Sequence, residues 1–234
     1  MPILHRLLLC GCFAAALSAC GLIDTDIADF DLSLPEKEIV VDTGQWELTG
    51  EESMPSVDCS DNAAVCSLGV EELCGAEGIC FGSCSAEQTC DVKILVNLWH
   101  NFDLAKEKPE LEEIEGQPLV SVEIKKIAYR VDENTLNMDT PALTVYAAPA
   151  GVMAPGDPQA QAIGTLPPIP AGMVSGEQDV ILTPDGRAIL ADFMRQYSVP
   201  FNLIVGTDID VRAGDLVPTG SLTTVVVVTA VAGI

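Results

Sequence analysis

The chain has 234 residues and carries 35 Asp and Glu against 11 Lys and Arg, which gives a net charge of −24. A surface this acidic repels phosphate backbones and anionic headgroups, so nucleic-acid binding and membrane adhesion through a basic patch are both disfavoured. The length is enough for one sizeable domain, and 48% of the residues are hydrophobic.

The first 19 residues have the layout of an export signal. A basic start precedes an apolar stretch, residues 7–17, which is too short to span a bilayer. It leads into Leu17-Ser18-Ala19-Cys20, where the bulky leucine stands at a position that ordinary cleavage sites give to a small residue. A plain secretory leader with incidental cysteines is the alternative interpretation.

The segment Leu17-Ser18-Ala19-Cys20 resembles the lipobox of bacterial lipoproteins. The resemblance implies that the Cys20 thiol receives a diacylglycerol, that residues 1–19 are removed, and that the new amino terminus is acylated with a fatty acid such as palmitate. Two or more acyl chains hold a protein stably on a membrane, whereas one chain binds only marginally. In this family an aspartate after the cysteine often signals inner-membrane retention, so Gly21 favours the outer membrane.

Residues 20–37 predict an acidic tether between this anchor and the rest of the chain. The stretch contains four aspartates and a single basic residue, Lys37. Its apolar residues Ile27, Phe30 and Leu32 suggest an alternative, in which part of the stretch packs on the domain.

Six cysteines fall within residues 58–91 and predict a disulfide-rich insertion. An even number of cysteines in a short exported segment with few large apolar residues indicates that covalent links replace a core. Zinc is the alternative, but structural zinc ligands usually come as C-x2-C pairs, and here three to seven residues separate successive cysteines. The sequence leaves the pairing open. The six residues are Cys59, Cys66, Cys74, Cys80, Cys84 and Cys90.

The remaining chain, residues 38–234, predicts a single β-sandwich domain that contains this insertion. Apolar and polar residues alternate over residues 38–43 and 92–104, which indicates a half-buried strand on each side of the cysteines. The insertion therefore joins two strands of the sandwich.

The next predicted strand, residues 119–131, changes the parity of its apolar residues at Lys125 and Lys126. A β-bulge at this pair keeps both halves facing the core, and a bend between two sheets is the alternative. A short strand at residues 143–147 follows. A long connection rich in Gly, Ala and Pro, residues 149–172, is interpreted as a rigid surface loop in preference to a polyproline ligand.

Residues 183–197 predict the one amphipathic helix, preceded by a short strand at residues 180–182. Thr183 is expected to cap the helix, and Pro184 and Asp185 suit its first turn. An apolar stripe follows the helical period and is expected to cover the sandwich as a lid. The stripe consists of Ile189, Leu190, Phe193, Met194 and Tyr197.

Two further strands complete the domain. Residues 201–211 alternate clearly, whereas residues 221–234 form a run of valines and threonines without a polar face, which predicts a strand covered on both sides by the helix or by a partner protein. The elements amount to seven or eight strands and one helix. The sequence therefore predicts a mainly β fold, an antiparallel β-sandwich of immunoglobulin-like or jelly-roll type.

The predicted mature chain contains one histidine, His100, and no G-x-S-x-G motif, so we assign no catalytic residue. His100 lies in the inward phase of its strand and is interpreted as a hydrogen-bonded core histidine. Its neighbour Trp99 lies on the polar face, where it is expected to pack under the cysteine insertion, with ligand contact as the alternative.

Two oxygen-rich stretches, residues 132–139 and the group Asp208, Asp210 and Asp215, suggest calcium as an alternative, but neither has the EF-hand loop pattern. We therefore expect no metal and no cofactor. The leading hypothesis is a non-enzymatic, lipid-anchored envelope protein that binds or scaffolds another envelope protein or surface component. A lipid-anchored hydrolase with paired carboxylates and a calcium-dependent adhesion or glycan-binding module are the alternatives.

Overall fold

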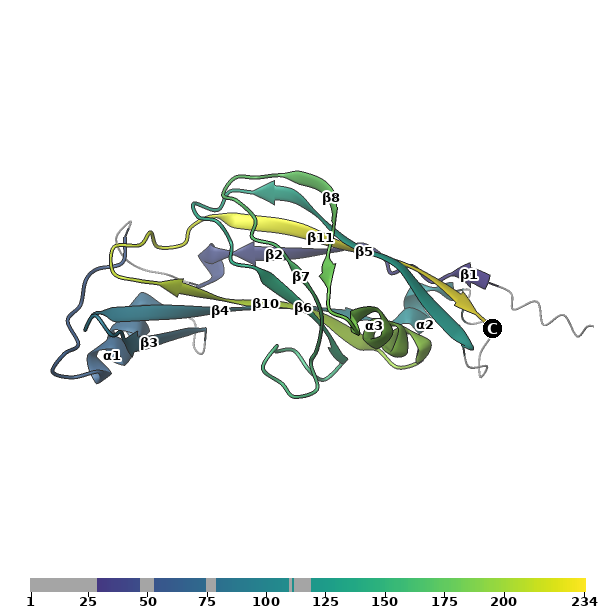
Figure 1. The fold of residues 1–234 in the computed structure, drawn as a ribbon, viewed down its shortest axis with the longest axis horizontal. Coiled ribbons are helices and arrows are strands. Elements are labelled where there is room, and N and C mark those ends of the chain that lie inside the picture. Colours follow the sequence, from purple (N-terminus) through teal and green to yellow (C-terminus); the bar gives the residue numbers. More distant parts are fainter. Residues whose placement is uncertain (1–28, 47–52, 75–78, 110, 112–118) are drawn as a thin grey trace, which may run out of the picture.

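The computed structural model describes residues 29–46, 53–74, 79–109, 111 and 119–234 (Figure 1). The predicted leader, the lipobox with Cys20 and the first part of the tether lie outside the described residues.

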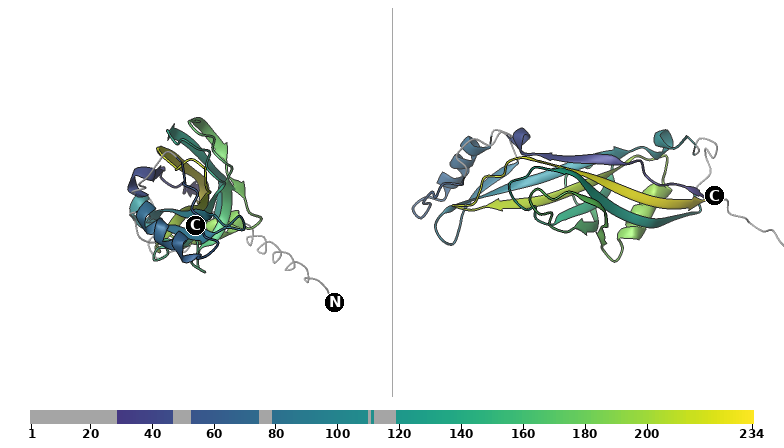
Figure 2. Two further views of the ribbon diagram at one scale, coloured as in Figure 1. Left: turned by 90° about the vertical axis from the view of Figure 1, so that its left-hand side faces the viewer. Right: turned by 90° about the horizontal axis from the view of Figure 1, so that it is seen from above.

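The described chain forms two antiparallel sheets that pack face to face, as the sequence predicted (Figures 1 and 2). The five-stranded sheet has the order β1-β11-β5-β8, and β2 pairs with β11 on the same edge as β1. Its strands are β1 (Asp29–Asp31), β2 (Lys37–Asp42), β5 (Ser121–Asn134), β8 (Ser175–Asp179) and β11 (Ser221–Gly233). The six-stranded sheet consists, in order, of β3 (Cys80–Cys84), β4 (Cys90–Phe102), β10 (Phe201–Val211), β6 (Leu143–Pro149), β7 (Gln161–Leu166) and β9 (Ile181–Leu182).

The core lies between the inner faces of the two sheets, and strand alternation places its residues there. On β4, Val92, Ile94 and Val96 are buried while Lys93 and Asn97 face solvent. The described helices are η1 (Thr43–Trp46, a 3-10 helix), α1 (Ala64–Leu73), α2 (Leu104–Glu107) and α3 (Gly186–Arg195). Helices α1 and α2 were not predicted.

The predicted β-bulge on β5 is confirmed. Thr229 of β11 lies opposite Lys126 and the next residue, Ala230, lies opposite Ile124, so Lys125 is the additional residue. Because the bulge absorbs it, Ile124 and Ile127 are both buried in the core although three positions separate them.

The chain crosses from one sheet to the other at Val180. Strand β8 before it pairs with β5, and strand β9 after it pairs with β7, so the predicted single strand at residues 180–182 is a corner. The Val180 N–H donates to the Ile127 carbonyl, 3.0 Å away. A Cβ on Gly164 of β7 would lie 2.6 Å from a Val180 methyl carbon, which explains why this corner requires glycine. Strand β7 corrects the prediction that residues 149–172 are all loop.

The predicted helix exists as α3, and its apolar stripe packs as a lid against β5, β6 and β7, which belong to both sheets. The predicted cap is wrong. The Thr183 hydroxyl donates to the carbonyls of Ala162 and Ile163 in β7, and the N-cap residue is Asp185, which makes no side-chain capping bond. The hydroxyl therefore fastens the entry of the helix to the sheet instead of capping it.

The predicted tether is part of the sandwich from Asp29 onward. Strand β1 pairs with the last residues of β11, and Leu32 and Leu34 are buried with their N–H groups bonded to the carbonyls of Ala230 and Val228. The alternative that apolar residues of this stretch pack on the domain is thus confirmed for Leu32 and Phe30, and Ile27 lies outside the described residues.

The prediction that α3 covers the last strand is wrong, because α3 contacts β5, β6 and β7. Strand β11 is central in its sheet, with β5 on one edge and β1 and β2 on the other. On its outer face Val225 is registered between Glu38 and Arg130 and is only 1% exposed. The long side chains of Glu38 and Arg130 cover Val225, which explains why an apolar residue is buried on the outer face. Cover by a partner protein stays a prediction.

Candidate functional site

The cysteine-rich insertion, which we call the disulfide module (residues 58–91), forms a second layer over one end of the six-stranded sheet. Helix α1 packs on β3 and the start of β4, where the five-stranded sheet no longer covers them. The backbone of α1 approaches β3 closely, because a Cβ on Gly82 would lie 2.2 Å from the Cys66 carbonyl oxygen. The insertion is thus a compact helix-on-hairpin unit continuous with the sheet.

The predicted disulfides are confirmed, and all six cysteines pair. Cys59 pairs with Cys84, Cys66 with Cys90, and Cys74 with Cys80, with Cα separations of 5.8, 5.3 and 6.3 Å. These separations are ordinary for disulfides. Each bridge joins the α1 side of the module to β3 or β4, so the three bridges together fix the helix on the hairpin.

The module has only a small apolar cluster of its own. Cys59, Cys66 and Cys90 are buried there, with Val57 and Val65 packed against them. The three sulfur atoms lie within 4.8 Å of one another, as metal ligands would. Each is engaged in a disulfide, however, so none offers the thiolate that zinc requires. Covalent bridges, and not a metal, hold this end of the molecule.

A helical signal for α1 was present in the sequence. Cys66, Val70 and Cys74 are spaced four residues apart, which is one face of a helix, and all three are buried. Asn62 begins the segment, and its Oδ1 accepts the N–H of Ala64 at 3.0 Å. The cysteines were interpreted only as bridge partners, so this periodicity was missed.

The surface of the module is acidic and carries exposed apolar side chains. Residues 58–91 contain seven Asp and Glu and no Lys or Arg. Leu68 on α1 is 63% exposed and Phe81 on β3 is 52% exposed. Phe81 is registered beside Lys93, whose Nζ lies 3.0 Å from Asp208 and 3.6 Å from Asp210. Because Gly82 faces α1, the adjacent Phe81 lies on the opposite face of β3, whereas Leu68 lies on the outer face of α1. The module therefore presents one exposed apolar side chain on each of its two faces.

The module lies at one end of the elongated molecule, and β1 and the carboxyl terminus lie at the other (Figures 1 and 2). Strand β4 connects the two ends: Cys90 begins it in the module, and Phe102 ends it against Phe201, with ring centroids 5.7 Å apart. The 13 residues of β4 correspond to a length of about 40 Å.

His100 forms the predicted hydrogen bond, but the prediction that it is a core residue is wrong. It is half-buried on the inward face of β4, and its Nε2 lies 2.5 Å from the Glu38 carbonyl oxygen in β2. The contact links the two sheets along this edge of the sandwich. This ring nitrogen is therefore occupied by a backbone group.

Trp99 lies on the outer face of β4 and is 42% exposed. The prediction that it packs under the module is wrong, because β3 pairs with β4 only from Cys90 to Ile94. Trp99 instead lies opposite Ile204, which the loop after β6 buries together with Val152. Contact of Trp99 with a ligand stays a prediction.

Several carboxylates of the two oxygen-rich stretches have protein donors as partners. Asp208 and Asp210 pair with Lys93, Asp215 accepts the N–H of Arg212 at 2.9 Å, and Asp139 accepts the N–H of Ala171 at 2.8 Å. These bonds account for the acidic clusters as local structure.

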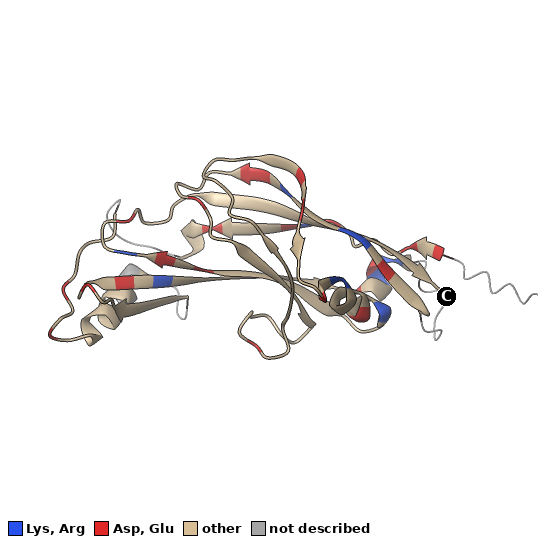
Figure 3. Cartoon of the chain, viewed as in Figure 1, with Lys and Arg blue, Asp and Glu red and all other residues tan. Residues whose placement is uncertain are grey.

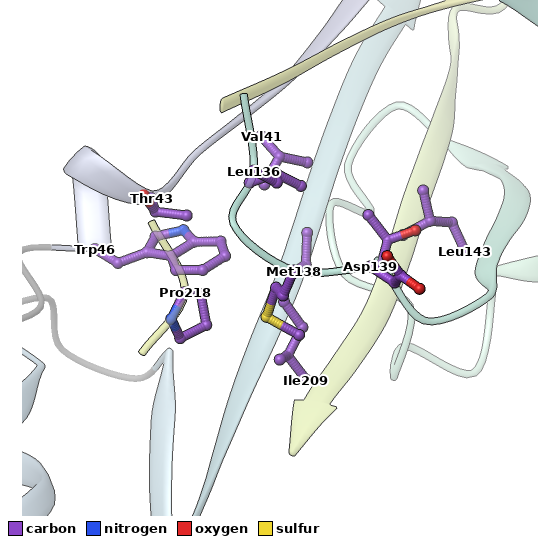
Figure 4. A pocket seen from close by; sticks show the side chains of 11 residues that line it. Val41, Thr43, Trp46, Leu136, Met138, Asp139, Leu143, Ile209 and Pro218 are labelled. Carbon is purple, nitrogen blue, oxygen red and sulfur yellow. The ribbon is translucent and has the colours of Figure 1, made fainter. Parts of the chain in front are cut away.

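A small apolar cavity lies between the sheets, lined by Val41, Trp46, Met138 and Pro218 among others (Figure 4). Its volume of about 20 Å³ is space for roughly one water molecule. It therefore has no room for an organic ligand. Asp139 is the single carboxylate among its lining residues, so it does not provide the carboxylate pair of a glycosidase-type site.

No family model, curated protein or solved structure matches the chain. Within the described ranges, no helix is both long and apolar enough to cross a membrane.

Proposed function

We propose that the chain is a lipid-anchored lipoprotein of the bacterial cell envelope, held on a membrane by an acylated Cys20, and that it binds or scaffolds another envelope component without catalysing a reaction. The outer membrane is the location that Gly21 favours. The observation that carries the proposal is the placement of β1 and the disulfide module at opposite ends of the molecule (Figure 1).

The distance along the chain from the anchor to the domain is short. Asp29, the first residue of β1, follows Cys20 by nine positions, which corresponds to at most about 30 Å of extended chain. An acylated Cys20 therefore keeps the β1 end close to the headgroups. The module, at the far end of β4, faces away from the membrane and is accessible to a partner.

The construction of the module suits recognition of a macromolecule. Three bridges hold α1 against β3 and β4 before any partner arrives, so little conformational entropy is lost on binding. Leu68 on the outer face of α1 and Phe81 on the outer face of β3 each supply an exposed apolar contact on this rigid support. Both features support a preformed binding surface.

The anchor is tested with Cys20→Ala, and Cys12→Ala serves as the matched control because it removes a leader cysteine outside the lipobox. Cells grown with a labelled fatty acid are fractionated. We expect label and membrane association for the wild type and Cys12→Ala, and neither for Cys20→Ala. A Cys20→Ala protein that still carries label in the membrane fraction contradicts the anchor.

Binding at the module is tested with a photocrosslinking residue placed at Leu68 or Phe81 in the full-length protein in intact cells. Val120, which is 64% exposed near the carboxyl-terminal end of β11, is the control position. We expect one discrete adduct from Leu68 or from Phe81, depending on which face of the module the partner covers. An adduct from Val120 alone contradicts binding through the module.

A further inference from the structure

A groove lies away from the disulfide module, between the bulge of β5, the Val180 corner and the first turn of α3. Lys125, Lys126 and Arg187 line it together with Asp179. It is open to solvent and encloses about 720 Å³, enough for a small anionic group with its hydration. Figure 3 shows the basic residues of β5 and α3 close together in an otherwise acidic chain.

The bulge is the reason that two consecutive lysines share this groove. In a regular strand Lys125 and Lys126 would point to opposite faces, but Lys125 is the additional residue, and neither lysine lies in the core. Arg187 comes from a segment about sixty positions later, and its Nη1 donates to the Ile124 carbonyl at 3.1 Å. The guanidinium is thereby held against the same stretch of β5 that carries the two lysines.

The current partners of these cations hold them only weakly. Lys125 lies 2.6 Å from Glu123 and Lys126 lies 2.6 Å from Glu177, and the side chains of both pairs are 42 to 70% exposed. Exposed pairs of this kind contribute about 0–1 kcal/mol, so an incoming anion can replace the carboxylate. Within the described parts of the chain Arg187 forms no ion pair, although acidic residues outnumber basic ones three to one.

We propose that this groove binds a small oxyanion of the phosphate type, either free or as part of a lipid headgroup. Arg187 provides a planar fork of donors that matches phosphate oxygens, and the two lysines neutralise its charge. The proposal concerns a different surface from the disulfide module and does not depend on it.

Asp179 provides a second test of the proposal, because its substitution is expected to change anion binding in the direction opposite to that of the basic residues. Its carboxylate lines the same groove and repels an anion there. Asp179→Asn removes this repulsion without changing the size of the side chain, so it is expected to strengthen binding, whereas Arg187→Gln and Lys125→Gln are expected to weaken it. A purely structural role of the three residues would not produce changes of opposite sign.

The experiment uses the full chain with Cys20→Ala, so that acylation does not itself bring the protein to lipid. Inorganic phosphate is titrated by NMR, and vesicles of phosphatidylglycerol or phosphatidylcholine are tested by flotation. We expect Arg187→Gln to weaken binding about tenfold, the loss of one charge-assisted hydrogen bond. Arg212→Gln, with the same charge change outside the groove, is expected to bind like the parent.

Phosphate binding that Arg187→Gln weakens and Arg212→Gln preserves supports a free oxyanion. Binding to phosphatidylglycerol vesicles alone, with the same dependence on Arg187, supports a headgroup. Absence of both kinds of binding, or equal losses in the two arginine variants, overturns the proposal. Lys125→Gln, which leaves the Arg187 bond to Ile124 in place, guards against a variant that fails only because it unfolds.

Discussion

Asn101 and Asn202 lie opposite each other on β4 and β10, and the Asn101 amide donates to Asn202 Oδ1 at 2.9 Å. The amide of Asn202 in turn donates to the carbonyls of Ala150 at 3.1 Å and Val152 at 2.8 Å. Asn202 is completely buried although it lies on the outer face of the sheet. The pair therefore fastens the loop after β6 over that face, where Val152 covers Ile204.

Asn202→Ala is expected to destabilise the fold by about 2–3 kcal/mol, because it leaves the carbonyls of Ala150 and Val152 without their donor and removes the shorter bond of the Asn101 amide. Urea denaturation followed by circular dichroism measures the change. Asn97→Ala is the control, since Asn97 is exposed on the same face of β4. A loss no larger than that of the control means that Asn202 does not hold the loop.

The bulge permits a deletion that most strands do not. Removing Lys125 leaves a regular alternation in which Ile124 and Ile127 still face the core, so the variant is expected to fold with a change of about 1 kcal/mol or less. Removing Ala128, beyond the bulge, turns the inward residues that follow toward solvent and is expected to abolish folding. Thermal melts of both variants test this, and equal tolerance of the two deletions contradicts the assignment of Lys125 as the additional residue.

Parity was the most informative feature of the sequence. Alternation of apolar and polar residues predicted the long strands. The parity change at Lys125 and Lys126 predicted the bulge, because one extra residue moves every later side chain to the other face of the strand. Short strands such as β1 and β7 have too few alternating residues to be recognised. In β7 the glycine at 164 is required by contact with Val180, which only the tertiary structure provides.

The candidate surfaces were less accessible to sequence reasoning. The six cysteines were identified, but fifteen pairings are possible, and the partners become apparent only once α1 lies on β3 and β4. The groove combines Lys125 with Arg187, which lie in elements far apart in the sequence. Thr183 was assigned as a cap from its position before the helix, whereas its hydroxyl bonds to β7.

The three disulfides are expected to differ in their effect on stability. Cys66 and Cys90 are 24 positions apart, and Cys74 and Cys80 are 6 apart. Loop-closure entropy predicts that removing the first bridge by paired Cys→Ser changes costs about 3.5 kcal/mol and removing the second about 2 kcal/mol. Hydrogen exchange is expected to show faster exchange in α1 and β3, with protection in β10 and β11 retained. Loss of hydrogen-exchange protection throughout the sandwich contradicts the interpretation that the module is a separate layer whose stability does not hold the two sheets together.

Tyr129 predicts a specific dependence of stability on alkaline pH. Its side chain is buried on β5, its hydroxyl donates to Gln178 Oε1 at 2.9 Å, and burial raises the pKa of the phenol above its usual value of 10.0. The folded state favours the neutral phenol. The contribution of this preference to the free energy of unfolding is therefore complete below pH 10 and is lost as pH rises through the folded-state pKa.

Tyr129→Phe removes both the hydrogen bond and the titrating group. At pH 7 we expect the variant to be about 1 kcal/mol less stable than the wild type, because Gln178 loses its donor. Above pH 10 the wild type alone loses stability from this group, so the difference in free energy of unfolding narrows or changes sign. Urea denaturation at a series of pH values measures this difference in free energy of unfolding. The ionisation of the other two tyrosines does not affect the difference, because both proteins contain them. A difference that stays constant from neutral to alkaline pH shows that burial does not shift the ionisation of Tyr129.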